Sequence, residues 1–170
     1  MKFTRLNHIK QRGLTLIEVM VALAIGGLVI AGALALYNSA SSSQVANQLN
    51  SGISAIRAST KSLYATTGGY GTGSLNSVLI NANKVPSTLY YSGSTITHQL
   101  NGNVTITGAT TTFTITVTNI PTDVCVSLAT AATGYSSVQI GATTLSTFPI
   151  TPAIASSNCT SGVTMIFTAS

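Results

Sequence analysis

The most conspicuous shortage in this sequence is charge. Asp, Glu, Lys and Arg together make up 5% of the 170 residues, whereas an ordinary soluble protein has about 25%. Four of the seven cations, Lys2, Arg5, Lys10 and Arg12, lie within the first twelve residues. Residues 14–170 hold three cations and two carboxylates, a net charge of +1. Because a nucleic-acid-binding surface needs several cations on one face, no nucleic-acid binding is expected.

Ionisable groups of the kinds used in catalysis are equally scarce. After residue 13 the sequence has one Glu, one Asp and one His, namely Glu18, Asp123 and His98. Catalysis needs several such groups close together, and Glu18 lies in an apolar run, away from Asp123. A set of His98, Asp123 and a serine could be composed, but the spacing selects none. We interpret His98 as a solvated loop residue and Asp123 as a residue in the first turn of a helix. Neither enzymatic activity nor a cofactor is expected.

Cysteine is limited to two residues, Cys125 and Cys159, which lie 34 positions apart. An export signal precedes them, so they are expected to reach an oxidising compartment, where one disulfide is the simplest interpretation. Two buried free thiols are the alternative. The sequence has no CxxC pair and one histidine beyond residue 13, so a metal site is not expected.

In contrast to these shortages, the N-terminal part contains a long apolar run. Val19 to Leu36 is 18 residues without a charge, and the run extends back to Leu14 with Glu18 as its one charged residue. About 20 helical residues cross a hydrocarbon core of about 30 Å. The basic residues before the run predict that its N-terminal end stays in the cytoplasm. The segment is therefore predicted to span the inner membrane.

Two ordinary interpretations of this run are a secretory signal peptide and a plain membrane anchor. Ala33-Leu34-Ala35 offers a small-x-small cleavage site, but the run exceeds the usual apolar region of about 7–15 residues. A carboxylate such as Glu18 costs about 2.5–3.5 kcal/mol at mid-bilayer and less near the interface. A mere anchor gains nothing from it, so Glu18 needs a partner.

The junction Gln11-Arg12-Gly13-Leu14-Thr15-Leu16-Ile17-Glu18 resembles the type IV pilin signature. The resemblance implies that an inner-membrane prepilin peptidase cuts after Gly13 and N-methylates Leu14. It also implies that Glu18 pairs with the new α-amine of a neighbouring subunit. This pairing would neutralise two charges that are expensive in an apolar filament core.

Helical periodicity continues beyond the apolar run. Between Gln44 and Tyr64 apolar residues recur at steps of 4, 4, 3 and 7, which predicts an amphipathic helix ending near residue 65. Residues 39–43 are poor helix formers, so local bending or melting is expected there. A turn at Gly68–Gly73 and a short helix from Leu75 to Ala82 are predicted to follow.

The remainder of the sequence predicts a small mixed domain. Alternation between Asn103 and Asn119 predicts two antiparallel strands separated at Gly108. Residues 145–158, which include Pro149 and Pro152, are interpreted as an irregular segment that a Cys125–Cys159 bridge would pin. Further elements are predicted as a helix at Val124–Ala132 and strands at Ser137–Ile140 and Val163–Thr168.

This arrangement is similar to type IVb pilins, closest to the bundle-forming pilins of enteric bacteria and the thin-pilus pilins of conjugative plasmids. The likeness is carried by Val124–Thr130, by Ile150-Thr151-Pro152-Ala153, by Cys159 before a closing strand and by Leu14. It implies an α+β fold in which a long helical spine packs against an antiparallel sheet with a disulfide-pinned C-terminal region. The expected parts are a leader (1–13), a membrane or filament-core half-helix (14–37), an amphipathic half-helix (38–65) and a globular region (66–170).

The resemblance also implies a function. The chain is expected to be a structural subunit that leaves the inner membrane for an extracellular pilus used in adhesion, aggregation or conjugative mating. Its expected partners are copies of itself, the prepilin peptidase and N-methyltransferase, an inner-membrane assembly platform and an outer-membrane secretin. The alternatives are a minor pilin, a type II secretion pseudopilin, or a Sec-secreted adhesin released after Ala35.

Overall fold

The structure is a computed structural model that describes residues 15–170. They form two units, an N-terminal segment ending at Ser39 and a compact head unit of residues 40–170. The helices are α1 (Leu16–Leu63), α2 (Asn76–Asn81), α3 (Thr122–Ala131) and α4 (Pro152–Asn158). The strands are β1 (Gly71–Ser74), β2 (Tyr90–Ser92), β3 (Thr95–Thr97), β4 (Asn103–Thr110), β5 (Thr112–Ile120), β6 (Ser137–Ile140), β7 (Thr143–Leu145) and β8 (Val163–Ala169).

Helix α1 has 48 residues and belongs to both units. Residues 39–43 are helical within it, so the expected melting there is wrong for the single subunit. Beyond them one face of α1 enters the core of the head unit through Ala46, Leu49, Ile53 and Ile56, each at most 4% exposed. This is the face that the apolar periodicity predicted, and its burial keeps the second half of the helix on the sheet.

The head unit is built around an antiparallel sheet of eight strands, ordered β2-β3-β4-β5-β8-β6-β7, with β1 also paired to β4. Burial alternates along most of β4 and β5 and all of β8, so apolar residues such as Ile106, Phe113, Ile115 and Met165 face the core. Threonines fill the opposite face, where Thr105 pairs with Thr116. The period-2 pattern of the sequence thus decides which face α1 covers.

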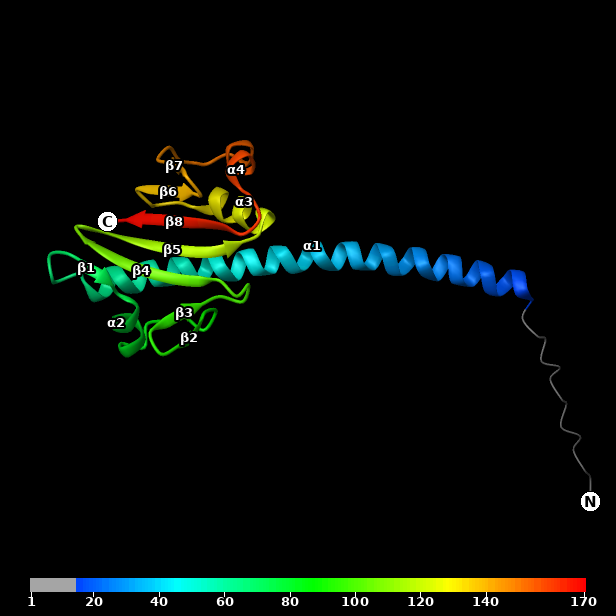
Figure 1. The fold of residues 1–170 in the computed structure, drawn as a ribbon, viewed down its shortest axis with the longest axis horizontal. Helices are drawn as coiled ribbons and strands as arrows, with labels where there is room; N and C mark the ends of the chain where they lie inside the picture. Colours follow the sequence, from blue (N-terminus) through cyan, green and yellow to red (C-terminus); the bar gives the residue numbers. More distant parts are fainter. Residues whose placement is uncertain (1–14) are drawn as a thin grey trace, which may run out of the picture. The chain divides into compact units, whose positions relative to one another are not determined.

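Smaller elements gather at the two ends of this sheet (Figure 1). Helices α3 and α4 contact each other beside β6 and β7, whereas α2 contacts β3 and β4 near β2. The predicted α2, α3, β6 and β8 are confirmed with small shifts in their ends. The antiparallel sheet and the α+β class are confirmed as well.

The edge of β4 is shared by three partners. Strand β3 pairs with its first two residues and β1 with its last four. Buried Asn76 fills the gap, because its side-chain amide donates to the Val104 carbonyl (3.1 Å) and accepts from the Ile106 N–H (2.8 Å). The amide thus completes the hydrogen bonds that a continuous neighbouring strand would have made.

Two local predictions are wrong. Gly108 does not separate two strands, since it lies within β4 opposite Phe113, and the turn falls at Thr111. A Cβ at Gly108 would lie 2.5 Å from the Tyr70 carbonyl oxygen, so the glycine admits the backbone that leads into β1. Part of the turn expected at Gly68–Gly73 is strand β1 itself.

The segment interpreted as irregular contains regular structure. Strand β7 ends at Leu145, and α4 occupies Pro152–Asn158. The Thr151 side chain caps α4 by accepting a hydrogen bond from the Ile154 N–H, and Pro152 stands in the first turn. Threonine followed by proline is a typical helix start, and the sequence analysis did not use that signal.

Candidate assembly site

The start of α1 is fixed by local hydrogen bonds. Thr15 lies just before the helix, and its carbonyl accepts from the backbone N–H groups of Glu18 (3.0 Å) and Val19 (3.2 Å). Its hydroxyl also accepts from the Glu18 N–H at 3.4 Å. The Thr-x-x-Glu spacing matches the sequence of a capping box, a signal that the sequence analysis missed. The caps place Glu18 in the first helical turn, where a carboxylate is favoured.

Apolar side chains of the N-terminal segment are exposed to an unusual degree. Leu16 and Leu28 are each 76% exposed, and no residue of the 19-residue stretch Leu16–Leu34 is buried within the protein. By length and mean hydropathy (2.3) this stretch is the one helix of residues 15–170 able to cross a membrane. An apolar surface of this size needs lipid or another protein chain around it.

The predicted processing site lies just outside the part that the structure describes. Gly13 and Leu14 precede Thr15, so cleavage between them and methylation of Leu14 stay predictions. Within residues 15–170, no ion pair joins Glu18 to a cation. Pairing of Glu18 with an α-amine also stays a prediction.

The predicted disulfide is confirmed. Cys125 on α3 and Cys159 directly after α4 are bonded, with their Cα atoms 5.8 Å apart. The bridge joins two helices that already contact each other, and it encloses β6, β7 and the loop around Pro149. Free thiols are thereby excluded for both cysteines.

Asp123, the one carboxylate side chain of the head unit, begins α3. A hydrogen bond from the Ser42 side chain is the main cause that lowers the pKa of Asp123. Burial opposes this effect, and backbone groups at Val124 and Asp123 lower the pKa further. The first-turn position predicted for Asp123 is confirmed. The contact with Ser42 ties α3 to α1 within the head unit.

Arg57 makes a second tie between α1 and the segment after α3. Its Nη1 donates to the Thr133 carbonyl at 2.9 Å, and its guanidinium lies 4.6 Å from the ring centroid of Tyr135. Burial raises the pKa of Tyr135, and the positive charge of Arg57 partly offsets that rise. This is the geometry of a cation–π contact with a structural role.

His98 is where the structure corrects the sequence analysis most clearly. The side chain is 2% exposed, so the interpretation as a solvated loop histidine is wrong. Its Nε2 lies 2.9 Å from the Thr118 carbonyl oxygen, and Leu100 N–H donates to its Nδ1 at 3.3 Å. Burial lowers the pKa of His98, against a smaller raising effect of the Thr118 carbonyl. Asp123 lies on α3, and the hydrogen bonds of the His98 ring go to Thr118 and Leu100, not to Asp123.

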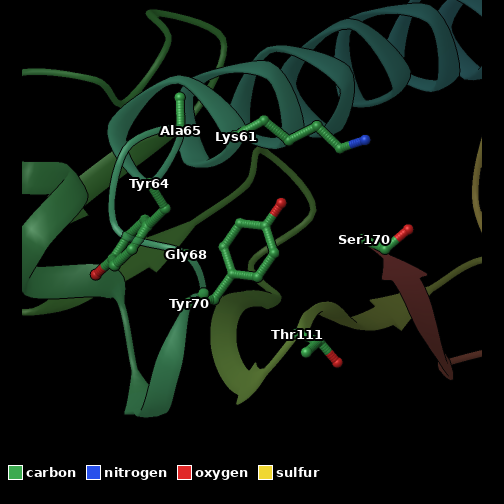
Figure 2. Close-up of a pocket in the computed structure, with 8 residues that line it drawn as sticks. Lys61, Tyr64, Ala65, Gly68, Tyr70, Thr111 and Ser170 are labelled. Carbon is green, nitrogen blue, oxygen red and sulfur yellow. The ribbon is translucent and has the colours of Figure 1, made fainter.

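A shallow pocket of about 280 Å³ lies where α1 ends. Figure 2 shows Tyr70, Lys61, Thr111 and the C-terminal Ser170 around its opening, with Tyr64 to one side. Lys61 is its one ionisable side chain apart from the tyrosines, so the pocket offers no acid–base pair. Among residues 15–170 no group of three His, Cys, Asp or Glu side chains could hold a metal ion.

Comparison with protein families gives two matches. The model described as "PilS N terminal" matches residues 43–170, and the model described as "Prokaryotic N-terminal methylation motif" matches residues 9–34. The first covers most of the chain, and the second covers the junction and the apolar run. No match to a curated protein was found.

Solved structures show the same fold. A type IV b pilin from Salmonella typhi is 22% identical, with a TM-score of 0.59 over 71% of this chain and 95% of that one. TcpA, a type IV pilin from Vibrio cholerae El Tor biotype, is 14% identical, with a TM-score of 0.57 over 75% of this chain and 99% of that one. These likenesses show the fold, and the family rests on the model matches. The fold is therefore that of the type IV b pilin from Salmonella typhi. The chain belongs to the PilS family, carries the N-terminal methylation motif, and is a type IV pilin subunit.

Proposed function

We propose that this pilin is cut between Gly13 and Leu14, methylated on Leu14, and polymerised into an extracellular filament whose core is built from residues 14–37. The observation that carries the proposal is the exposed apolar surface of Leu16–Leu34. Lipid covers that surface in the inner membrane, before the subunit is assembled. Neighbouring helices cover it in the filament, so the same residues serve both states.

Glu18 sets the depth at which an incoming subunit docks against its neighbour. Removal of the leader creates an α-amine at Leu14, one helical turn before Glu18. A lone carboxylate in an apolar environment is costly, whereas a paired and hydrogen-bonded one is tolerated. An incoming subunit that places its amine beside the Glu18 of its neighbour removes both charges from the core. Docking at any other depth leaves both unpaired, which disfavours it.

Small residues support close packing of such helices. Ala22 and Gly26 lie four positions apart, as do Gly27 and Ala31, and added Cβ atoms at Gly26 and Gly27 would meet no neighbour within 4 Å in the subunit. This space is open to a second helix, and small-xxx-small spacing lets helix backbones approach closely. Export through an assembly platform and an outer-membrane secretin, and a task in adhesion, aggregation or mating, complete the proposal.

N-terminal mass spectrometry of sheared filaments tests this function. The expected result is a subunit that begins at Leu14 and carries one added methyl group. A subunit beginning at Leu36 would mean cleavage after Ala35 and would overturn the proposal in favour of a secreted domain. An intact Met1 would make the segment an anchor. A methylated Leu14 in trace amounts beside another major subunit would assign the chain to a minor pilin or pseudopilin.

A further inference from the structure

The turn between β3 and β4 encloses His98 with both ring nitrogens engaged. The Thr118 carbonyl can only accept, so the hydrogen between it and Nε2 must belong to the ring. The Leu100 N–H can only donate, so Nδ1 must present a lone pair to it. These two bonds together define a neutral imidazole with its proton on Nε2.

The backbone around the ring leaves it no alternative position. The His98 N–H donates to the Gly102 carbonyl at 3.0 Å, and the Asn101 N–H donates to the His98 carbonyl at 2.9 Å. A Cβ at Gly102 would collide with both the His98 ring and the Thr118 carbonyl. The ring therefore fills the space between the turn and β5, and it cannot turn over without opening the turn.

This turn holds one end of the sheet. Strand β3 pairs with β4 at two positions, Ile96 with Val104 and Thr97 with Asn103. Strand β2 reaches the sheet through β3 alone. The β2–β3 edge, which carries the exposed side chains of Tyr90 and Tyr91, thus depends on a short ladder that ends at the His98 turn.

No charged side chain compensates a proton on this ring. The neighbouring strands β3, β4 and β5, and α2, which contacts β3 and β4, contain no Asp, Glu, Lys or Arg. Strand β2 contributes the phenols of Tyr90 and Tyr91, the loop before it contributes Lys84, and the charges that α1 brings to the head unit are those of Arg57 and Lys61. The causes that set the pKa of His98 are burial and the Thr118 carbonyl, without a contribution from any of these groups.

We propose that the His98 turn is an acid-sensitive latch: the neutral ring closes it, and a proton on Nδ1 opens it and releases the β2–β3 edge. Protonation would set the Nδ1–H against the Leu100 N–H, two donors without an acceptor between them. The imidazolium would also lose hydration in its buried position. The conflict between the two donors and the loss of hydration both end when the ring moves into water. The ring can reach water only if the turn opens.

The direction of the pH dependence follows from linkage. The pKa of His98 is lowered below 6.5 in the folded state, so the unfolded or opened form binds a proton more readily. The closed turn therefore has its full stability above about pH 6.5 and loses it as the pH falls toward the lowered folded value. Asp123 acts in a separate window, because its contribution persists until the pH falls below 3.8.

Hydrogen exchange on the full chain in detergent micelles, corrected for intrinsic rates, tests the latch between pH 7.5 and pH 5. We expect amides of residues 90–104 to lose protection by up to about tenfold per pH unit below the onset, while amides of β8 keep theirs. Gly102→Ala should open the turn at both pH values and reproduce the acid pattern. Equal protection of residues 90–104 at pH 7.5 and pH 5 would overturn the proposal.

His98→Gln keeps a donor for the Thr118 carbonyl and cannot take up a proton, so its exchange should not respond to acid. An acid response in His98→Gln equal to that of the unmodified chain would contradict the latch. If His98→Gln is open at both pH values, NMR titration of the His98 ring in the unmodified chain decides. The same midpoint for the ring and for the loss of protection supports the latch, and loss of protection without titration of the ring overturns it.

Discussion

The N-terminal segment and the head unit use the same kinds of apolar residue in opposite ways. Leu16 and Leu34 are 76% and 58% exposed, whereas Ile53 and Phe113 in the head unit are at most 1% exposed. The head unit satisfies its apolar residues within one chain, through the sheet and the second half of α1. The apolar side chains of the N-terminal segment are not covered within the single chain, so they need lipid or other subunits around them.

Asp123 and Glu18, the two carboxylate side chains after residue 13, differ in the same way. Asp123 receives a hydrogen bond from Ser42 within the same head unit. Glu18 contributes to the first turn of α1, and within the described residues it has no cation beside it. If Glu18 pairs with a second chain, as proposed, its replacement should block assembly, whereas replacement of Asp123 should have only a small cost.

The largest effect is expected for Glu18→Ala. Without the carboxylate, the α-amine of a docking subunit enters the apolar core unpaired, at a cost of up to about 3 kcal/mol, the value for a charge at mid-bilayer. The variant should still be cleaved and remain in the membrane, while sheared filaments fall below detection. Immunoblots of the membrane and sheared fractions measure both quantities. Asp123→Ala is the matched control, and normal filament yield from Glu18→Ala would remove the contrast between the two carboxylates.

The next largest effect is expected from the loss of the disulfide. Cys125→Ser combined with Cys159→Ser frees a loop of 34 positions and should lower the free energy of unfolding by about 4 kcal/mol on the chain-entropy model. For a head unit of this size that corresponds to a fall in Tm of about 15 °C. Near-ultraviolet circular dichroism of the tyrosines follows the transition. An unchanged Tm would show that the contact between α3 and α4 suffices without the bond.

Substitutions at two isoleucines, one in each region, compare how much each region contributes to the stability of the head unit. Ile56 is 0% exposed and Ile30 is 62% exposed. Ile56→Ala should lower the free energy of unfolding of the head unit by about 2–5 kcal/mol through lost burial and a residual cavity. Ile30→Ala should change it by less than about 0.5 kcal/mol. Urea unfolding of the full chain in micelles gives both values, and equal effects would mean that the segment contributes to the stability of the head unit.

The smallest effect is the acid dependence set by Asp123. Its pKa is lowered from 3.8 in the folded chain, so its contribution to stability is present above that value and is lost as the pH falls through the folded pKa. Because the side chain is exposed, the contribution should be less than about 1 kcal/mol. Asp123→Asn should flatten the fall of Tm between pH 4 and pH 3. An identical fall in the variant would assign it to other groups.

Much of the fold was predictable because the burial pattern follows the sequence periodicity. The apolar face of α1 and the alternation in β4, β5 and β8 repeat at helical and strand periods, and each packs as predicted. Cys125 and Cys159 were paired from their number and from the export signal. The boundaries expected at residues 37 and 65 stay predictions.

The missed features depend on contacts between distant residues. Gly108 looked like a strand break because a glycine weakens a strand, and its reason, the approach of the Tyr70 backbone, is visible only in three dimensions. His98 looked solvated because polar residues surround it in the sequence, yet Thr118 and Leu100 bury it. Nothing in the sequence indicated that the side chain of Asn76 bonds the backbone at the edge of β4.

A cryo-electron microscopy structure of sheared filaments tests the contrast between the two regions most directly. We expect helices of residues 14–37 packed together in the core, with Glu18 beside the α-amine of a neighbouring subunit and the strand order of the head unit unchanged. A filament held together by head units alone, with residues 16–34 absent or facing solvent, would contradict it.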